Sequence, residues 1–204
     1  KELLKRLGNK GQIIGIEVDK QIYDKASIIF ERTKNVSVYN RNFIDVDKLV
    51  LLCGYNEVDG IIFDLGTNLF QIKESGRGLS FLKNEKLDMR LDKSTHLTAR
   101  EVVNSYTKEK LEEVLKRVDE SFYRQIAKKI TDYRRSKKIE TTFELSEVVE
   151  SVKRRRGKIH PATLTFMALR IEVNNEINNL EEALKKSVDI LKKNGRLAVI
   201  SFHS

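Results

Sequence analysis

Short runs of β-branched residues occur at both ends of the chain, separated by segments with helical spacing. The first, residues 13–18, is apolar on both faces, as in a buried parallel strand, and Val36–Tyr39 and Val58–Asp64 are similar runs. A fourth strand is expected at residues 196–200, after a helix that Asn194 and Gly195 should end. The helices expected between the strands cover residues 22–33, 44–52 and 180–191. Strands alternating with helices predict an α/β fold with a doubly wound parallel sheet.

The middle of the chain, from about residue 81 to 165, has helical spacing throughout. Thr98 with Glu101, and Thr141 with Glu144, each have the Thr-x-x-Glu pattern of a capping box. One apolar stripe is expected to follow a single long helix through Leu111, Val114, Leu115, Val118, Phe122, Ile126 and Ile130. This segment is predicted to be an all-helical insertion.

The length of 204 residues allows one or two domains of ordinary size. The predicted division assigns residues 1–81 and 166–204 to the sheet domain and 82–165 to the insertion. With 40% hydrophobic and 34% charged residues, the composition excludes a disulfide scaffold or a low-complexity chain. The apolar runs are far shorter than the ~20 residues of a membrane-spanning helix, so no membrane partner is expected. A lone cysteine, Cys53, fits a reducing compartment, and a cytoplasmic location is expected.

Basic residues exceed acidic residues by 39 to 30, which gives a net charge of +9 and favours an anionic partner such as nucleic acid. Two basic clusters lie in the predicted insertion, at residues 124–138 and at Lys153, Arg154, Arg155, Arg156 and Lys158. Each could be a solvated charged surface. Two clusters in one insertion favour phosphate contacts, which position RNA without reading its sequence. His160 could contact a substrate phosphate or cap the helix that Pro161 begins.

Acidic residues stand at the ends of two predicted strands, where open α/β sheets bind their ligands. Glu17 could accept hydrogen bonds from ribose hydroxyls, as in nicotinamide dehydrogenases and in methyltransferases, or it could be a solvated carboxylate. Asp64 ends a run expected to be buried, where an acid is costly unless it binds something. Its alternatives are a helix cap or an ion pair within the loop. The glycine-rich turn that separates the two cofactor classes is expected to precede Lys1.

Several further motifs occur in a fixed order along the chain. They are Arg-Gly-Leu-Ser-Phe at 77–81, Leu-Asp-Met-Arg-Leu-Asp at 87–92, His-Pro-Ala-Thr at 160–163, Thr-Phe-Met-Ala-Leu-Arg-Ile at 165–171 and Ile-Ser-Phe-His-Ser at 200–204. In this order, over essentially the whole chain, the sequence resembles the bacterial ribosomal RNA cytosine-N4 methyltransferases, also called the MraW family.

The resemblance implies a Rossmann-like S-adenosylmethionine-dependent methyltransferase sheet with an inserted all-helical domain. It also implies methylation of the N4 amino group of a cytidine in small-subunit (16S) ribosomal RNA, with the RNA or the 30S particle as partner. Carried over by position, Glu17 is the acidic ribose ligand, Phe43 an aromatic cofactor contact, Asp64 the acid of the Asp-Leu-Gly motif and Gln71 a further cofactor contact. Arg154, Arg155, Arg156 and His160 are the expected RNA contacts. No cysteine and histidine spacing indicates a metal site.

The chain departs from the family after Asp-Leu-Gly. The family usually continues Val-Ser-Ser-Pro-Gln, whereas this chain has Thr67-Asn68-Leu69-Phe70-Gln71 without either serine. Asn68 is therefore the candidate catalytic residue, as an amide that could accept a hydrogen bond from cytosine N4, or else it stabilises its own turn. The family's glycine-rich amino-terminal segment and carboxyl-terminal strands are expected outside this chain.

Two other functions stay open at this point. A non-catalytic RNA-binding or ribosome-assembly protein on the same fold gains weight from the altered 67–70 segment. A nicotinamide-dependent dehydrogenase would use Glu17 on ribose.

Overall fold

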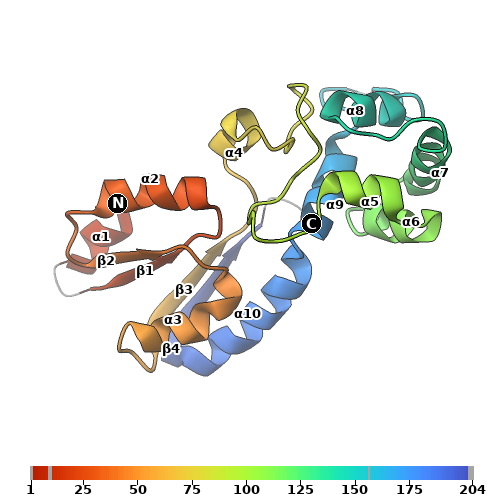
Figure 1. Ribbon diagram of the computed structural model, residues 1–204. Coiled ribbons are helices and arrows are strands. Elements are labelled where there is room, and N and C mark those ends of the chain that lie inside the picture. The colour runs from red at the N-terminus through yellow and green to blue at the C-terminus, as the bar shows by residue number, and fades with distance from the viewer. Residues whose placement is uncertain (1, 9–10, 156, 202–204) are drawn as a thin grey trace. The chain divides into compact units, whose positions relative to one another are not determined.

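The computed structural model describes residues 2–8, 11–155 and 157–201, which form two compact units (Figure 1). The first unit is formed by the residues up to Asp64 and by Ile177–Ile200, and the second is built on Leu65–Glu176. These boundaries differ from the expected 81/82 and 165/166. The reason is that Phe81, Phe166 and Leu169 pack in or against the apolar core of the helical segment, so the flanking motifs belong with it.

The first unit contains two parallel strand pairs, each with helices between its strands. The elements of the first pair are α1 (Glu2–Leu7), β1 (Ile13–Ile16), α2 (Lys20–Phe30) and β2 (Val36–Tyr39). β1 and β2 pair in register from Ile13 opposite Val36 to Ile16 opposite Tyr39. Helix α2 begins after Asp19, whose carboxylate accepts a hydrogen bond from the Gln21 N–H at 3.0 Å. This cap fixes where the chain turns from the end of β1 into the helix.

The second pair joins segments that are far apart in the sequence. Its elements are a 3-10 turn (Phe43–Asp45), α3 (Val46–Leu52), β3 (Val58–Asp64), α10 (Glu176–Ile190) and β4 (Leu191–Ile200). β3 and β4 pair in register from Gly60 opposite Arg196 to Asp64 opposite Ile200. The Lys186 ammonium of α10 donates to the Ile44 carbonyl at 2.7 Å, which ties α10 to the 3-10 turn.

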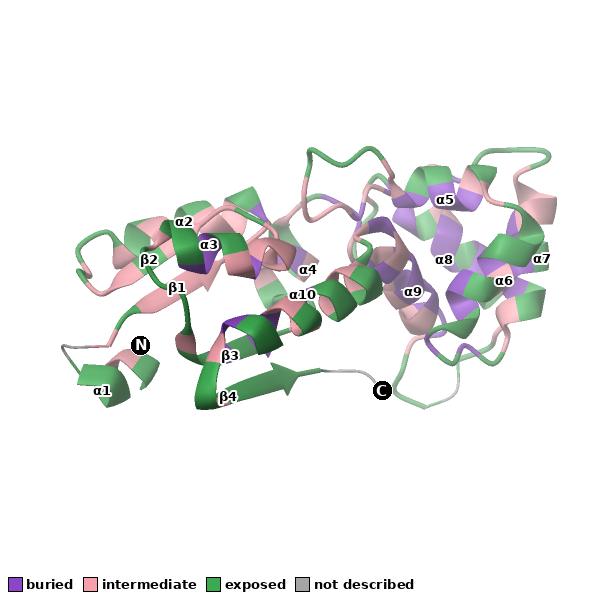
Figure 2. Cartoon of the chain, turned by 90° about the horizontal axis from the view of Figure 1, so that it is seen from below, coloured by how far each residue is buried: buried purple, intermediate pink, exposed green. Residues whose placement is uncertain are grey.

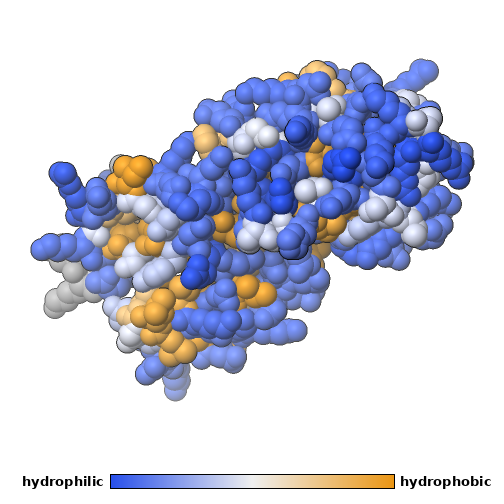
Figure 3. Space-filling view, viewed as in Figure 1, coloured by the Kyte–Doolittle hydropathy of each residue, from blue (hydrophilic) through white to orange (hydrophobic). Residues whose placement is uncertain are grey.

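The strands form two separate two-stranded sheets in the described residues, not one continuous sheet. The expectation that Val58–Asp64 is a buried strand is confirmed for one face only. Ile61 and Phe63 of β3 are buried, whereas the intervening Ile62 is 52% exposed, and β4 is exposed along most of its length (Figure 2). Apolar surface also lies over α2 and α3, where Ile28 and Leu52 are exposed (Figure 3). The structure is a mixed α/β protein with small parallel sheets.

The turn at Asn194 and Gly195 lies in a strand and does not end the preceding helix. Helix α10 already ends at Ile190, because Leu191 pairs with Val58 and starts β4. Asn194 still has the left-handed backbone expected of a turn, with φ of 67°. The register of β3 against β4 shifts at this turn, so these residues form an irregularity within the strand.

The second unit is helical and has its own apolar core. Its helices are α4 (Leu69–Glu74), α5 (Ala99–Ser105), α6 (Lys108–Lys116), α7 (Tyr123–Tyr133), α8 (Thr142–Glu150) and α9 (Thr163–Val173). Both predicted capping boxes are confirmed: the Thr98 and Thr141 side chains accept from the backbone of Glu101 and Glu144, whose carboxylates accept in return. Figure 2 shows the buried residues on the inner faces of α5 to α9. No helix of the described part is long and apolar enough to cross a membrane.

The apolar stripe expected on one long helix is divided between α6 and α7. Asp119 has a left-handed backbone with φ of 55°, which breaks the helix. The next residue, Glu120, has a completely buried carboxylate that accepts from the Lys153 ammonium at 2.7 and 2.9 Å and from the Phe122 N–H at 3.1 Å. The expectation of a single helix is therefore wrong, because this buried ion pair holds the chain in a turn that apolar spacing does not reveal.

The segment before α5 depends on a tight contact at Gly78. The Gly78 N–H donates to the Glu85 carboxylate at 2.8 Å, and its backbone is left-handed with φ of +67°. A Cβ atom at this position would lie 2.3 Å from the Lys86 carbonyl oxygen. Only glycine fits here, since both the backbone conformation and the space exclude a side chain.

We expect Gly78→Ala to lower the free energy of unfolding by more than Gly76→Ala, as measured by urea denaturation. Gly76 has nearly the same φ, +68°, but a Cβ there would have no atom within 4 Å. Gly76→Ala should therefore cost only the left-handed strain of about 1–2 kcal/mol. Gly78→Ala should add an overlap cost of about 1–3 kcal/mol. Equal losses for the two variants would contradict the tight contact.

Candidate functional site

Glu17 lies directly after β1, at the carboxyl end of the first strand pair. Its N–H donates to the Tyr39 carbonyl at 3.0 Å, and its carboxylate accepts from the Asp19 N–H at 2.8 Å. The Asn40 amide donates to the Glu17 and Val18 carbonyls at 2.9 and 3.0 Å, which fixes the backbone after the strand. The half-exposed carboxylate is thus held at the strand end, where it can accept hydrogen bonds from a ligand hydroxyl.

Asp64 ends β3 and is exposed. The argument that it must bind something to offset the cost of burial is therefore wrong, although an exposed carboxylate still accepts hydrogen bonds. Phe43 lies near this strand end. The centroid of its ring is 5.6 Å from the ring centroid of Phe63, the residue before Asp64. The structure thus brings Phe43 and the end of β3 together, but β1, which precedes Glu17, is not paired with β3 in the described residues.

The chemistry of these first-unit residues suits a nucleoside. A carboxylate at a strand end accepts from the hydroxyls of a ribose, and an aromatic ring provides a flat apolar contact for a base. Glu17, Phe43 and Asp64 supply these two kinds of group. The residues present therefore fit a nucleoside-containing cofactor.

Asn68 and Gln71 belong to the second unit, where they form a reciprocal cap at the start of α4. The Asn68 amide oxygen accepts from the Gln71 N–H at 2.9 Å, and the Gln71 amide oxygen accepts from the Asn68 N–H at 3.0 Å. Gln71 is buried. Asn68 therefore stabilises its own turn, which was the alternative to a catalytic role. The signal was in the sequence, since Asn-x-x-Gln is itself a capping-box pattern.

Arg170 contacts the segment that leads into α4, and no role was predicted for it. Its guanidinium donates to the Glu176 carboxylate at 2.8 and 3.0 Å and to the Thr67 hydroxyl at 3.4 Å. The side chain is only 14% exposed. Because the fork of bonds to Glu176 fixes the plane of the guanidinium, Arg170 ties the segment after Asp-Leu-Gly to α9.

Asn174, one turn after Arg170, holds a second motif segment. Its amide oxygen accepts from the Leu91 N–H at 2.7 Å, and its amide nitrogen donates to the Met89 carbonyl at 2.9 Å. On the other side, the buried Arg77 donates to the carbonyls of Arg90 and Leu91 at 3.0 and 3.2 Å. Polar contacts within one unit therefore join the 77–81 and 87–92 motifs to each other and, through Asn174, to the end of α9, the helix that carries the 165–171 motif.

His160 is held by three contacts within the second unit. Its Nδ1 accepts from the Ala162 N–H at 3.2 Å, and its Nε2 lies 3.4 Å from the Glu150 carboxylate. The ring stacks on Phe81 with a centroid separation of 4.2 Å. The bond to Ala162 matches the capping alternative, since Ala162 precedes α9 directly.

The basic residues near His160 differ in their availability. Arg154 and Arg155 are exposed, whereas Lys153 is committed to the buried Glu120 carboxylate. Arg156 lies outside the described residues. In the 124–138 cluster, several cations have partners: Lys128 and Arg135 with Asp132, and Lys137 with Glu144. Basic residues that look equivalent in the sequence are thus divided between internal ion pairs and exposed charge.

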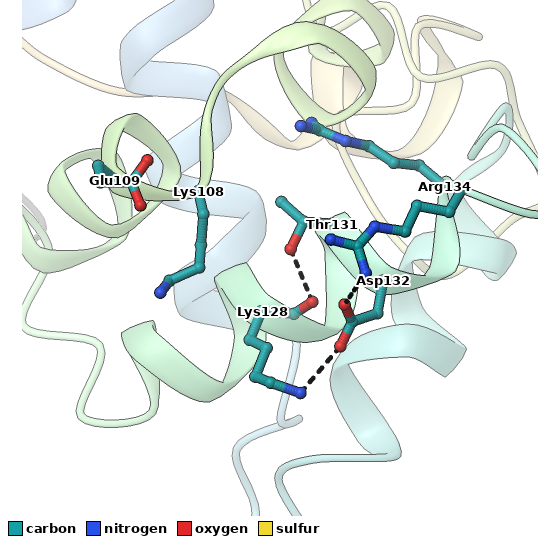
Figure 4. A pocket seen from close by; sticks show the side chains of 7 residues that line it. Lys108, Glu109, Lys128, Thr131, Asp132 and Arg134 are labelled. Atoms are coloured by element: carbon teal, nitrogen blue, oxygen red, sulfur yellow. Dashed lines mark hydrogen bonds and ion pairs between the residues drawn. The ribbon is translucent and has the colours of Figure 1, made fainter.

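A cleft of about 660 Å³ lies between the start of α6 and the second half of α7 (Figure 4). Lys108 and Glu109 line it from α6. The remaining lining residues come from α7 and the residues that follow it, and they are Lys128, Thr131, Asp132, Arg134 and Arg135. The lining residues in the described part of the chain are all polar or charged, with four cations and two carboxylates. The cleft therefore suits an anion more than an apolar ligand.

Comparison with known proteins gives a match along the whole chain. The model of the MraW methylase family matches residues 1–204. A relative from Caldicellulosiruptor bescii, "Ribosomal RNA small subunit methyltransferase H", is 42% identical over 206 residues, which cover 100% of this chain and 67% of the relative. Proteins of the same name from Persephonella marina and Clostridium botulinum (strain Kyoto / Type A2) are 45% and 42% identical, over 94% and 100% of this chain and 67% of each relative.

We expect Arg170→Lys to loosen the loop after Asp-Leu-Gly, because lysine cannot make the forked bond to Glu176 while also reaching Thr67. Hydrogen exchange of the amides in residues 66–72 should become several-fold faster. Arg117→Lys is the matched control, since Arg117 pairs with Glu172 of the same helix but does not contact the loop. If the two variants exchange alike over 66–72, Arg170 does not hold this loop.

Proposed function

The chain belongs to the MraW methylase family, and we propose that it catalyses S-adenosylmethionine-dependent methylation of small-subunit (16S) ribosomal RNA at the N4 amino group of a cytidine. The observation that carries this proposal is the family match over all 204 residues, together with relatives named as small-subunit ribosomal RNA methyltransferases. The partner is the RNA or the 30S particle, and the proposed location is cytoplasmic. The same match favours a methyltransferase over a nicotinamide-dependent dehydrogenase.

We propose further that the two strand pairs are parts of one Rossmann-like sheet. Residues 82–165 are the main part of the inserted helical domain, and Phe166 and Leu169 also belong to its core. Both pairs are parallel, and helices lie between successive strands, as a doubly wound sheet requires. Helices packed on both faces of such a sheet would also cover apolar side chains that are exposed here, such as Ile62 and Val199.

The proposed cofactor ligands are Glu17, Phe43, Asp64 and Gln71. S-adenosylmethionine, when bound, supplies an electrophilic methyl group. The Glu17 carboxylate accepts hydrogen bonds from ribose hydroxyls, and Phe43 gives an aromatic contact. Gln71 is proposed as a further cofactor contact. It is buried in the first turn of α4, where its side chain also caps the helix.

The target nitrogen sets the demands on the protein. The lone pair of cytosine N4 is delocalised into the ring, so the protein must hold the base and the methyl donor in a near-attack geometry. A hydrogen bond accepted from the amino group orients the lone pair and relieves positive charge as transfer proceeds. Asp64 and Asn68 are the proposed acceptors. The helix cap uses one lone pair of the Asn68 amide oxygen, and a carbonyl oxygen has two.

RNA is proposed to bind through Arg154, Arg155, Arg156 and His160. The exposed guanidinium groups of Arg154 and Arg155 favour phosphate contacts, since no described side chain pairs with them.

A second candidate function, a non-catalytic RNA-binding protein on this fold, is favoured by one observation. Asn68 acts as a helix cap in the segment that departs from the family pattern.

Loss of the Glu17 carboxylate is expected to weaken cofactor binding. Charge-assisted hydrogen bonds are worth about 1.5–3 kcal/mol each, so Glu17→Ala should raise the Kd for S-adenosylmethionine about 10- to 150-fold in calorimetry. Glu31→Ala, which removes an exposed carboxylate just after α2, is the control and should leave the Kd unchanged. An unchanged Kd in Glu17→Ala would remove Glu17 from the site.

Asn68 can be tested by separating its cap from its amide. Asn68→Ala loses both, whereas Asn68→Ser keeps a good N-cap oxygen in place of the amide. If Asn68 accepts from cytosine N4, both variants should lower kcat on small-subunit particles more than they weaken cofactor binding. Wild-type turnover in Asn68→Ser would identify Asn68 as a turn residue. Methylation absent from the wild-type protein, with RNA binding intact, would favour the non-catalytic alternative.

A further inference from the structure

Arg134 carries a positive charge that no carboxylate neutralises among the described residues. It follows α7, and its guanidinium donates to the carbonyls of Val103 and Tyr106 at 2.7 and 2.6 Å. These carbonyls lie at the end of α5 and offer only partial negative charge. Burial lowers the pKa of Arg134, and the neighbouring Arg135 lowers it further. A partly buried cation without a counter-ion favours binding of an anion from outside.

Arg134 lines the α6–α7 cleft, where further cations surround it. Lys108 stands at the first position of α6, and Lys128 and Arg135 lie across the cleft. Asp132 accepts from Lys128 at 3.0 Å and from Arg135 at 3.2 Å, so it holds these two cations in place. Its pKa is lowered, chiefly by the bond to Lys128, and it therefore stays charged. Lys108 pairs with Glu112 at 3.6 Å. Among the described residues, four cations thus stand against Asp132, Glu109 and Glu112, so the cleft keeps an excess of positive charge.

The size and lining of the cleft indicate the kind of ligand. Its volume of about 660 Å³ is enough for a nucleotide-sized group. Among the described residues, the lining includes no aromatic or aliphatic residue on which a base could stack. The cleft thus suits the backbone of a nucleic acid, with guanidinium and ammonium groups that donate to phosphate oxygens.

We propose that the α6–α7 cleft binds a phosphate group of the RNA backbone, at a site separate in sequence from Arg154 and Arg155. This proposal rests on the RNA-directed function proposed above and adds a defined contact to it. Arg134 supplies the partly buried charge. Lys108 and Lys128, which pair with Glu112 and Asp132 but stay exposed, supply ammonium donors from the two helices. The contact is independent of base sequence, so its role is to fix the position of the RNA on the helical unit.

The test compares two double variants that remove the same charge. Lys108→Gln with Lys128→Gln changes two lining residues, one on each helix. Lys116→Gln with Lys129→Gln changes two exposed lysines on the same two helices that do not line the cleft. Affinity for a small-subunit ribosomal RNA fragment is measured across a salt series. The lining variant should bind more weakly, with a slope of log K against log salt reduced by about 1.4–1.8, and the control should keep the wild-type slope.

Two further arms separate this proposal from the function on which it rests. Arg154→Gln with Arg155→Gln tests RNA binding elsewhere in the unit. If it weakens binding while the lining and control variants behave alike, RNA binding stands and the cleft proposal is overturned. If no form binds RNA, the proposed function and the RNA contact both fail.

The second arm uses inorganic phosphate as the probe. Thermal unfolding is followed in sodium phosphate and in sodium chloride at matched ionic strength. If the cleft holds phosphate groups, the increase in Tm on replacing chloride by phosphate should be larger for the wild type and the control than for the lining variant. If phosphate stabilises the protein but RNA does not bind, the RNA proposal is overturned and the ligand of the cleft is free phosphate. An equal Tm response in all three forms would overturn an anion site in the cleft.

Discussion

The polar contacts at the end of α9 determine how the motif segments of the second unit are arranged. Arg170 reaches Thr67 and Glu176, and Asn174 holds Met89 and Leu91. These bonds join segments separated by up to 103 residues. Because they are half-buried, they are protected from competition by water and fix one geometry. The motifs that identify the family are thus largely the parts that hold a loop in place, and only some of them are candidates to touch a ligand.

The buried ion pair between Glu120 and Lys153 has a similar consequence for charge. It takes one lysine out of a basic cluster and uses it to close the turn between α6 and α7. Breaking such a pair leaves a buried charge without compensation, so Lys153 is needed for folding whatever the neighbouring arginines bind. The basic clusters therefore contain both cations in structural ion pairs and cations that are exposed to solvent. The α6–α7 cleft combines them, since Asp132 holds two cations that still line an open surface.

The first unit presents a different physical situation. Its strands are parallel and rich in β-branched residues, a composition typical of sheets covered on both faces. In the described residues each strand has a single partner, and side chains such as Ile62 and Leu197 are exposed. The chain covers 67% of the length of its relative from Caldicellulosiruptor bescii. Two of the candidate cofactor residues, Glu17 and Asp64, nevertheless lie at strand ends, and Glu17 is held there by backbone hydrogen bonds.

The sequence by itself determined the features whose causes are local. The capping boxes at Thr98 and Thr141 depend on hydrogen bonds within a few residues. The strands Val36–Tyr39 and Val58–Asp64 were predictable from the residue types within each run, although their pairing partners lie elsewhere in the chain. It also determined the family, because ordered motifs are a property of the sequence. Only the tertiary structure decided the break between α6 and α7 and the exposure of Asp64. The break depends on a partner 33 residues away, and exposure depends on what packs over a strand, which spacing along a chain does not specify.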